Sequence, residues 1–361
     1  MYSNYSTLSV LRMEGRKIQR VGRATLAVSL PRAWVKETGI KQGDLVFCAP
    51  QKDGSLNIML STLAERKAEA KEYVVNSDLC GVTGILERIV VGNYVLGRDT
   101  VRVVSAKRIK PAHVAEVQKI VRKLMGMGII EETPTQIILQ CSIDAAKFPI
   151  PLVMRRLYII ASTMHKEAIQ ALLDSDRELA EGAARREDDA DMIYWLIVRL
   201  LFMAQRERAI ADQMGMEDPS EIAASRVLAG MLERMADWGE SIARNVIILE
   251  DRGLELGKQT VNRLSQISET AYNVCYSAME CVYTGNVELA NGAIETFKKT
   301  IEAEEDELMN RLPVEVPNSH AVACLTRIAW GIRRIAELGA EIAELAINRS
   351  LIRSSQLCEE A

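Results

Sequence analysis

The sequence predicts a multidomain, mainly helical protein. It has a small N-terminal β module, a small α+β domain and then two tandem three-helix bundles. Residues 1–60 carry nine Lys and Arg against four Asp and Glu, a net +5; the whole chain is −4, which leaves −9 for the other 301 residues. Aromatic residues are only 5% of the chain, and its C-terminal part repeats itself. We expect domains at 13–60, 70–145, 151–251 and 255–350.

Short alternating patterns predict the elements of the first module. Apolar residues alternate with polar ones on both sides of Gly22, which predicts two short strands and a turn. Pro31 is suited to the first turn of a helix, and Gly39 to its end. A Gly-Asp turn precedes a strand at 45–49, and Asp53-Gly54 predicts a hairpin to a last strand.

This module is too small to close a core alone. About forty-five residues bury too little apolar surface for independent stability, so we expect a second copy to complete the fold. Its positive charge, within an acidic protein, favours contact with nucleic acid. We therefore expect a homodimer that binds DNA.

The stretch GRKIQRVGRATLAVSLPRAW, followed by GIKQGDLV and DGSLNI, resembles the AbrB/SpoVT (swapped-hairpin) family of DNA-binding domains. The resemblance implies an interleaved homodimeric barrel whose N-terminal cations face DNA. The matching positions are Arg16, Lys17, Arg20 and Arg23. In the alternative interpretation the module only dimerises, and these cations are a solvated face.

The second domain, 70–145, has a mixed pattern. Strands are expected at 72–75 and 100–105, and helices at 84–95 and from Pro111 onward. Two further strands, at 129–132 and 136–140, give the order βαβαββ. The segment contains no glycine fingerprint or nucleophile motif, so a ligand sensor and a spacer both remain open.

From Pro151 onward the pattern is helical and repeats. The segment 234–243, RMADWGESIA, recurs at 334–343 as RIAELGAEIA, and ELAEGA at 178–183 recurs as ELANGA at 288–293. Two similar halves predict two bundles of three helices each. The helices are expected at 151–174, 177–212, 219–251, 255–284, 287–311 and 318–350.

This tandem resembles PhoU, the regulator associated with phosphate uptake, over about residues 150–350. The order of basic module, α+β domain and PhoU pair is similar to archaeal phosphate-uptake-regulator proteins. The resemblance implies helix-borne E/D-x-x-x-D pairs that bind divalent, iron or zinc ions. The matching pairs in the first half are Glu187/Asp191 and Glu233/Asp237.

Residues four apart share a helix face, so each pair offers two carboxylates to one ion. Chance alone gives about seven acidic pairs at this spacing in a chain of this composition, so the spacing decides little. The position of both pairs in the segments that resemble the family carries more weight. Four converging carboxylates repel one another, and a bound cation would relieve that repulsion.

The second half departs from this pattern. Its acidic candidates are Glu302, Asp306 and Glu337, but Arg333 stands where the first half has Glu233. Phe297 and Ile301 occupy the positions of the first acidic pair. A salt bridge from Arg333 to an acid is the alternative, and it would make this half structural. For Arg234 and Arg334, pairing with an acid on the same helix is favoured over phosphate binding.

We expect no enzymatic activity. The three His, at 113, 165 and 320, form no Glu-x-x-His motif and no recognisable catalytic constellation. The seven Cys include no CxxC pair, and no stretch resembles a signal peptide or membrane span, so a cytoplasmic protein with reduced thiols is expected. Met13 is an alternative start to Met1.

Together these features predict a DNA-binding regulator of phosphate uptake and phosphate homeostasis, whose PhoU-like body senses phosphate status. The alternative is an adaptor that negatively regulates a phosphate ABC transporter by protein–protein contact, with the N-terminal module serving only dimerisation. The expected partners are DNA, a second copy of the chain, and transporter components or a signalling partner.

Overall fold

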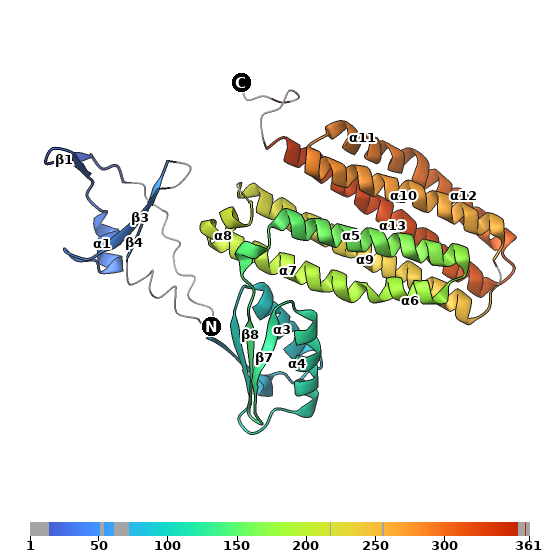
Figure 1. Cartoon of the computed structure of the whole chain (residues 1–361), viewed down its shortest axis with the longest axis horizontal. Coiled ribbons are helices and arrows are strands. Elements are labelled where there is room, and N and C mark those ends of the chain that lie inside the picture. The colour runs from blue at the N-terminus through green and yellow to red at the C-terminus, as the bar shows by residue number, and fades with distance from the viewer. Residues whose placement is uncertain are drawn as a thin grey trace, which may run out of the picture. The chain divides into compact units, whose positions relative to one another are not determined.

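The structure is a computed structural model that describes residues 14–50, 54–60, 72–216, 218–254, 256–352 and 358. It divides into two compact units, residues 1–70 and 71–361 (Figure 1). The alternative start at Met13 and the Asp53 position of the hairpin turn lie outside the described residues.

The first unit consists of two antiparallel strand pairs and one short helix. Strand β1 (Gln19–Val21) pairs with β2 (Thr25–Ala27), and β3 (Val46–Pro50) pairs with β4 (Leu56–Leu60). Helix α1 (Arg32–Thr38) follows Pro31 and ends at Gly39, whose φ of 70° is left-handed. The two pairs form separate two-stranded sheets within the chain. The interleaved dimeric barrel therefore stays a prediction.

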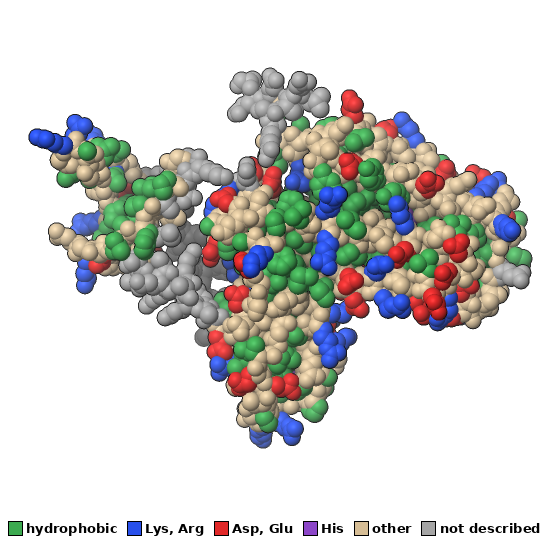
Figure 2. Space-filling model, in the orientation of Figure 1, with side chains coloured by type: hydrophobic (Ala, Val, Ile, Leu, Met, Phe, Trp, Pro, Cys, Tyr) green, Lys and Arg blue, Asp and Glu red, His purple; other side chains and the backbone are tan. Residues whose placement is uncertain are grey.

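The described residues of the first unit form almost no core. Among its described residues, Leu60 is the one buried apolar side chain, at 7% exposure. Ile18, Leu26 and Leu45 are each about two-thirds exposed, at 68%, 67% and 65%. Figure 2 shows hydrophobic side chains spread over its visible surface. Such surface needs another surface to cover it.

The second unit begins with a four-stranded sheet. The chain runs through β5 (Glu72–Asn76), α3 (Ile85–Val95), β6 (Thr100–Val104), α4 (Pro111–Lys123), β7 (Met127–Glu132) and β8 (Gln136–Cys141). The sheet order is β5-β6-β8-β7, with β5 parallel to β6 and the other pairs antiparallel. Val101 and Val103 on β6 and Leu139 on β8 are fully buried, because alternate residues face the core formed with α3 and α4.

The helical part follows in two halves. The first contains α5 (Ile150–Asp174), α6 (Arg177–Arg185), α7 (Glu187–Arg206), α8 (Arg208–Gln213) and α9 (Ser220–Asp251). The second contains α10 (Lys258–Thr284), α11 (Val287–Thr296), a π-helical turn at Phe297–Ile301, α12 (Glu302–Glu315) and α13 (Ser319–Ser350). The prediction of a mainly helical chain is confirmed.

Two predicted helices differ from the structure. The single helix expected at 177–212 is three helices. The i→i−4 backbone hydrogen bonding is interrupted at Arg186, whose N–H donates to the Ala183 carbonyl, and at Glu207, whose backbone is extended (φ −136°, ψ 108°). Neither position is Gly or Pro, so the sequence gives no break signal. The helix expected to end at 311 runs past Pro313, because α12 continues to Glu315. It ends at Val316, which precedes Pro317 and is extended.

The two halves share one continuous core rather than two separate ones. The repeated segments each contain a glycine at a close contact between helices. Gly239 on α9 packs against Met164 of α5, and Gly339 on α13 packs against Cys275 of α10. A Cβ at either glycine would lie 3.0 Å or 2.8 Å from that neighbour. Helices α9 and α13 also contact each other, where Trp238 and Trp330 meet edge to face with ring centroids 5.2 Å apart (Figure 1).

Candidate functional site

Helices α7 and α9 carry the first-half carboxylates. Glu187 opens α7 and Asp191 lies one turn later, while Glu233 and Asp237 lie one turn apart on α9, which packs against α7. The four side chains interact electrostatically, since the charge of Asp191 is among the causes that raise the pKa of each of the other three. The structure therefore brings the four predicted carboxylates into one electrostatic cluster, which we call the acidic cluster.

Burial and mutual repulsion raise the pKa values in this cluster. Partial burial, followed by the charge of Asp191, raises the pKa of Glu187 to about 7. Burial, followed by the charge of Asp237, raises the pKa of Glu233 to about 7. The same order of causes, burial and then Asp191, raises the pKa of Asp237 to about 6, although this residue is exposed. Near neutral pH the cluster therefore holds unfavourable negative charge that a cation would relieve.

Glu240 is a fifth carboxylate that the sequence prediction missed. Its charge raises the pKa values of both Glu187 and Asp237. It lies three residues after Asp237 and so shares a face of α9 with it. Glu240 also pairs with Arg244 one turn further along. Its i,i+3 spacing from Asp237 is the signal in the sequence that could have identified it.

Positive groups lie at the edge of the acidic cluster. Lys123, the last residue of α4, places Nζ 2.8 Å from Asp188 Oδ1 and 3.7 Å from Asp191 Oδ2. Arg226 of α9 donates to the Tyr194 hydroxyl at 3.0 Å, and its charge lowers the pKa of Glu233. Across the described residues, no group of three Asp, Glu, His or Cys side chains stands ready to hold an ion. The side chains would have to close around a cation.

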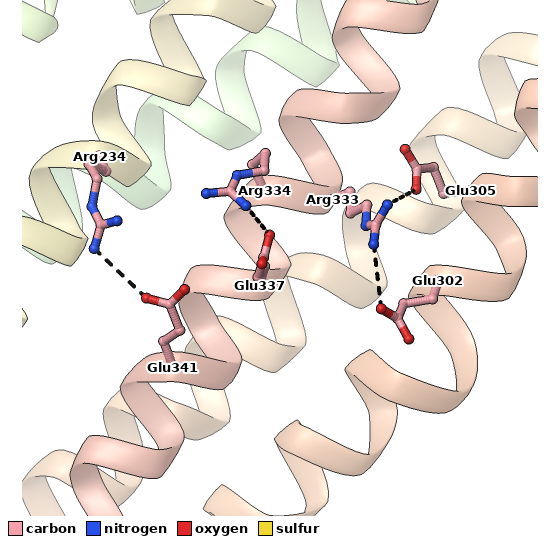
Figure 3. Close-up of polar contacts among 7 residues, drawn as sticks. All are labelled: Arg234, Glu302, Glu305, Arg333, Arg334, Glu337 and Glu341. Atoms are coloured by element: carbon pink, nitrogen blue, oxygen red, sulfur yellow. Dashed lines mark hydrogen bonds and ion pairs between the residues drawn. The ribbon is translucent and has the colours of Figure 1, made fainter.

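In the second half, an arginine side chain lies among the acids where the first half has only carboxylates (Figure 3). Arg333 of α13 donates to Glu305 at 3.0 Å and to Glu302 at 3.4 Å, both on α12. Glu305 is 5% exposed, and burial raises its pKa while Arg333 opposes that shift. The alternative of an Arg333 salt bridge is thus confirmed.

The acidic candidates of the second half separate from one another. Asp306 is exposed. The buried α12 acid that pairs with Arg333 is Glu305, which is not part of the predicted i,i+4 pair Glu302/Asp306. Glu337 pairs with Arg334 on its own helix (Figure 3). Phe297 and Ile301, at the positions of the first acidic pair, are buried apolar residues.

The intrahelical interpretation of the two repeated arginines is half right. It is confirmed for Arg334, which pairs with Glu337 of α13. It is wrong for Arg234, which reaches across to Glu341 of α13 at 3.8 Å and donates to the Gly230 carbonyl at 3.1 Å (Figure 3). The packing of α9 against α13 places that acid within reach.

Comparison with known proteins bears on this region. Residues 154–246 match the family model of the PhoU domain. The matched range contains all four predicted carboxylates of the acidic cluster, whereas the second half, from 255 onward, lies outside it. PhoU from Pseudomonas aeruginosa is a similar solved structure, with 18% identity and a TM-score of 0.45 over 55% of this chain and 93% of that chain. No curated protein matches the sequence.

The predicted DNA-contacting residues lie outside the PhoU domain, in the first unit. Arg20 is on β1 opposite Leu26, and Arg23 follows Gly22 in the turn to β2. Arg16 pairs with Glu14, and Lys17 lies between Arg16 and β1. All four cations are exposed. They can reach an anionic partner without rearrangement of a core.

The three histidines occupy core and surface positions. The His113 ring Nε2 donates a hydrogen bond to the Cys80 carbonyl at 3.0 Å, and His165 bonds the Ser268 hydroxyl at 2.8 Å. Burial lowers the pKa of His165 to about 4, so it is neutral in the core. His320 is exposed near the start of α13. Among the described helices, none is both long and apolar enough to span a membrane.

Glu233→Gln in the PhoU domain should make stability less dependent on pH. The folded carboxyl has a pKa of about 7 against an ordinary 4.5. As pH rises from 4.5 to 7, the unfolded chain loses its proton first, so the free energy of unfolding falls. The full shift corresponds to about 3 kcal/mol. Solvent screening at this half-buried position reduces the expected gain for the variant above pH 7 to about 1–2 kcal/mol.

Urea unfolding at pH 5 and pH 8, in the presence of a chelator, measures this effect. Glu344→Gln, at an exposed position of α13, is the control. A Glu233→Gln variant no more stable than wild type at pH 8 would contradict the electrostatic cost assigned to the cluster.

Proposed function

We propose that this protein is a DNA-binding regulator of phosphate homeostasis, acting in the cytoplasm as a homodimer. The observation that carries the proposal is the first unit, which combines a net charge of +5 over residues 1–60 with exposed apolar side chains among its described residues. A second copy would cover that surface and double the number of cations. The PhoU domain at 154–246 supplies the link to phosphate.

Phosphate contacts on DNA would come from Arg16, Lys17, Arg20 and Arg23. They lie before, on and just after β1, so a symmetric pair of modules would present two matching cationic edges. Contacts of this kind position a protein on the duplex and make its affinity depend on salt.

The PhoU-like helical part would sense phosphate status through a cation bound at the acidic cluster. Glu187, Asp191, Glu233 and Asp237 supply only oxygen donors, a set that fits hard divalent cations such as Mg²⁺ or Mn²⁺ better than zinc. The raised pKa values of three of them support this proposal, because a cation would relieve the repulsion that contributes to those shifts. In the second half Arg333 pairs with Glu302 and Glu305, so a protein cation already offsets part of their negative charge.

A triple replacement of Arg16, Arg20 and Arg23 by alanine tests the DNA-binding role. Each lost phosphate contact weakens binding, so we expect the affinity for duplex DNA to fall at least about tenfold while the dimer persists. Fluorescence anisotropy measures the affinity, and analytical ultracentrifugation measures the dimer. Lys36→Ala, at the end of α1, is a single-charge control outside the strand–turn segment.

The adaptor function is the second candidate, and exposed apolar residues on the body favour it. Leu152 and Ile159 on α5 and Tyr276 and Tyr283 on α10 are 64%, 51%, 47% and 41% exposed. These two helices contact each other, so the residues can form a surface for another protein. If the adaptor is correct, the triple variant will leave control of phosphate transport unchanged. If the regulator is correct, that control will be lost together with DNA binding.

A further inference from the structure

A pocket of about 210 Å³ lies at the end of the helical part where α5 and α9 begin and where α10 and α13 end (Figure 1). Its volume suits a small ion or molecule better than a nucleotide. Much of its wall consists of apolar side chains that are at most 3% exposed, namely Ile150, Met154, Met216 and Leu228. Charges that face such a wall are poorly screened by water, so they act strongly on a ligand.

Arg349 brings an unpaired positive charge to this pocket. It lies in the last turn of α13, is half-buried, and forms no hydrogen bond or ion pair with any residue that the structure describes. A helix C-terminus favours a cation, but that interaction leaves the N–H donors of the guanidinium unused. Arg349 is therefore available to donate to an anion in the pocket.

Two hydroxyl groups add further donors. Ser225 of α9 lines the pocket at 5% exposure, and its hydroxyl has no hydrogen-bond partner among the described residues. Buried hydroxyls are nearly always paired, so this one is free to bond a ligand. Burial raises the pKa of Tyr283 to about 12, which keeps the phenol protonated, and the nearby charge of Arg155 opposes that shift. A second guanidinium thus lies close to the same end of the pocket.

Glu221 also lines the pocket, at the start of α9, and it does not pair with Arg349. A carboxylate only accepts hydrogen bonds, so it repels an anion that has no proton and accepts a bond from an anion that keeps one. Near neutral pH, phosphate still carries a proton and sulfate carries none. The presence of Glu221 among the donors therefore favours phosphate over sulfate.

We propose that this pocket binds phosphate, as the free ion or as the phosphate group of a small ester, through Arg349, Ser225 and Tyr283 as donors and Glu221 as acceptor. The guanidinium fork matches the spacing of phosphate oxygens and can donate two parallel hydrogen bonds. The ligand would link α9 of the first half to α10 and α13 of the second, so binding should stabilise the folded helical part. A role of this pocket in sensing phosphate status rests on the function proposed above, whereas the binding itself does not.

Isothermal titration with inorganic phosphate tests the proposal. Wild type should bind one phosphate per chain, and Arg349→Gln should bind at least about tenfold more weakly, because a charge-assisted hydrogen bond is lost. Ser225→Ala should weaken binding about fivefold. Arg327→Gln is the matched control, since Arg327 is an exposed arginine on the same helix, about six turns earlier, that also has no ion pair among the described residues. It should bind like wild type.

Titrations with sulfate and with glycerol 3-phosphate identify the occupant. Wild type should prefer phosphate to sulfate, and Glu221→Gln should narrow that preference. Tighter binding of glycerol 3-phosphate than of phosphate, lost equally in Arg349→Gln, would support the site and identify an ester as its ligand. A wild-type protein that binds sulfate as well as phosphate would contradict the role given to Glu221.

Thermal unfolding shows whether the variants fold. Without phosphate, Arg349→Gln should melt like wild type, and added phosphate should raise the melting temperature of wild type alone. Absence of phosphate binding by wild type, or equal affinity in wild type and Arg349→Gln, would overturn the site. Because DNA plays no part in these measurements, such a result would leave the proposed regulator standing. Conversely, a protein that binds phosphate but not DNA would keep this site and lose that function.

Discussion

Replacing Arg199 by alanine should lower the free energy of unfolding of the second unit by about 3–5 kcal/mol, because it removes a large, fully buried side chain together with its hydrogen bonds. The Arg199 side chain is fully buried. Its guanidinium donates to the Tyr94 carbonyl at 2.7 Å and to the Arg98 carbonyl at 3.3 Å, and it forms an ion pair with Asp99. Alanine would take the side-chain donor away from the Arg98 carbonyl, leave the Tyr94 carbonyl with only the Gly97 N–H, and open a cavity between α7 and the sheet domain.

Arg206→Ala is the matched control for this prediction. Arg206 lies on the same helix and also donates to a carbonyl of the same segment, that of Leu96 at 2.7 Å, but it is exposed. Its loss should cost about 1 kcal/mol or less. Urea unfolding followed by tryptophan fluorescence suits the comparison, since Trp195 packs against both cores. Equal costs for the two variants would refute the role given to Arg199.

Replacing Gly339 by alanine should destabilise the protein by about 2–3 kcal/mol, toward the upper end of overpacking effects. A Cβ there would lie 2.8 Å from Cys275 Sγ and 3.1 Å from the Cys275 backbone nitrogen, so α13 would have to move away from α10. Backbone cannot turn aside as the end of a side chain can, and helices this close are held by many contacts.

Gly292→Ala is the opposite case. Gly292 lies inside α11, where an added Cβ would have no neighbouring atom within 4 Å, and its φ is not positive. Alanine there should stabilise the protein by about 0.5–1 kcal/mol, since it reduces the freedom of the unfolded chain. Thermal unfolding of the two variants should therefore shift in opposite directions. A Gly339→Ala protein that melts at the wild-type temperature or above contradicts the close-packing account.

Much of the chain's organisation was accessible from pattern alone. Helical periodicity indicated the long helices, and the repeat pointed to Gly239 and Gly339, whose shared role is close helix contact. The family-derived pairs lie on α7 and α9, which pack against each other, and their charges raise one another's pKa values. These features depend on local sequence and on symmetry, which a single sequence displays.

The parts that were missed depend on contacts between distant segments. Nothing near Lys123 in the sequence indicates that it meets Asp188 and Asp191, because the folding of α4 against α7 creates that contact. The pairing of Arg333 with Glu305 rather than Asp306 depends on which face of α12 meets α13. The helix breaks at Arg186 and Glu207 likewise occur where the sequence has no Gly or Pro to signal them.

The measurement that tests the central claim most directly is the affinity of the full-length protein for duplexes upstream of phosphate-transport genes, across a salt series. A dimer that uses Arg16, Lys17, Arg20 and Arg23 in each copy neutralises up to eight phosphates, so log affinity should fall against log salt with a slope of about −7. The account also predicts binding at least about a thousandfold tighter than to random DNA. Equal, weak affinity for both sequences would contradict it and leave the adaptor function.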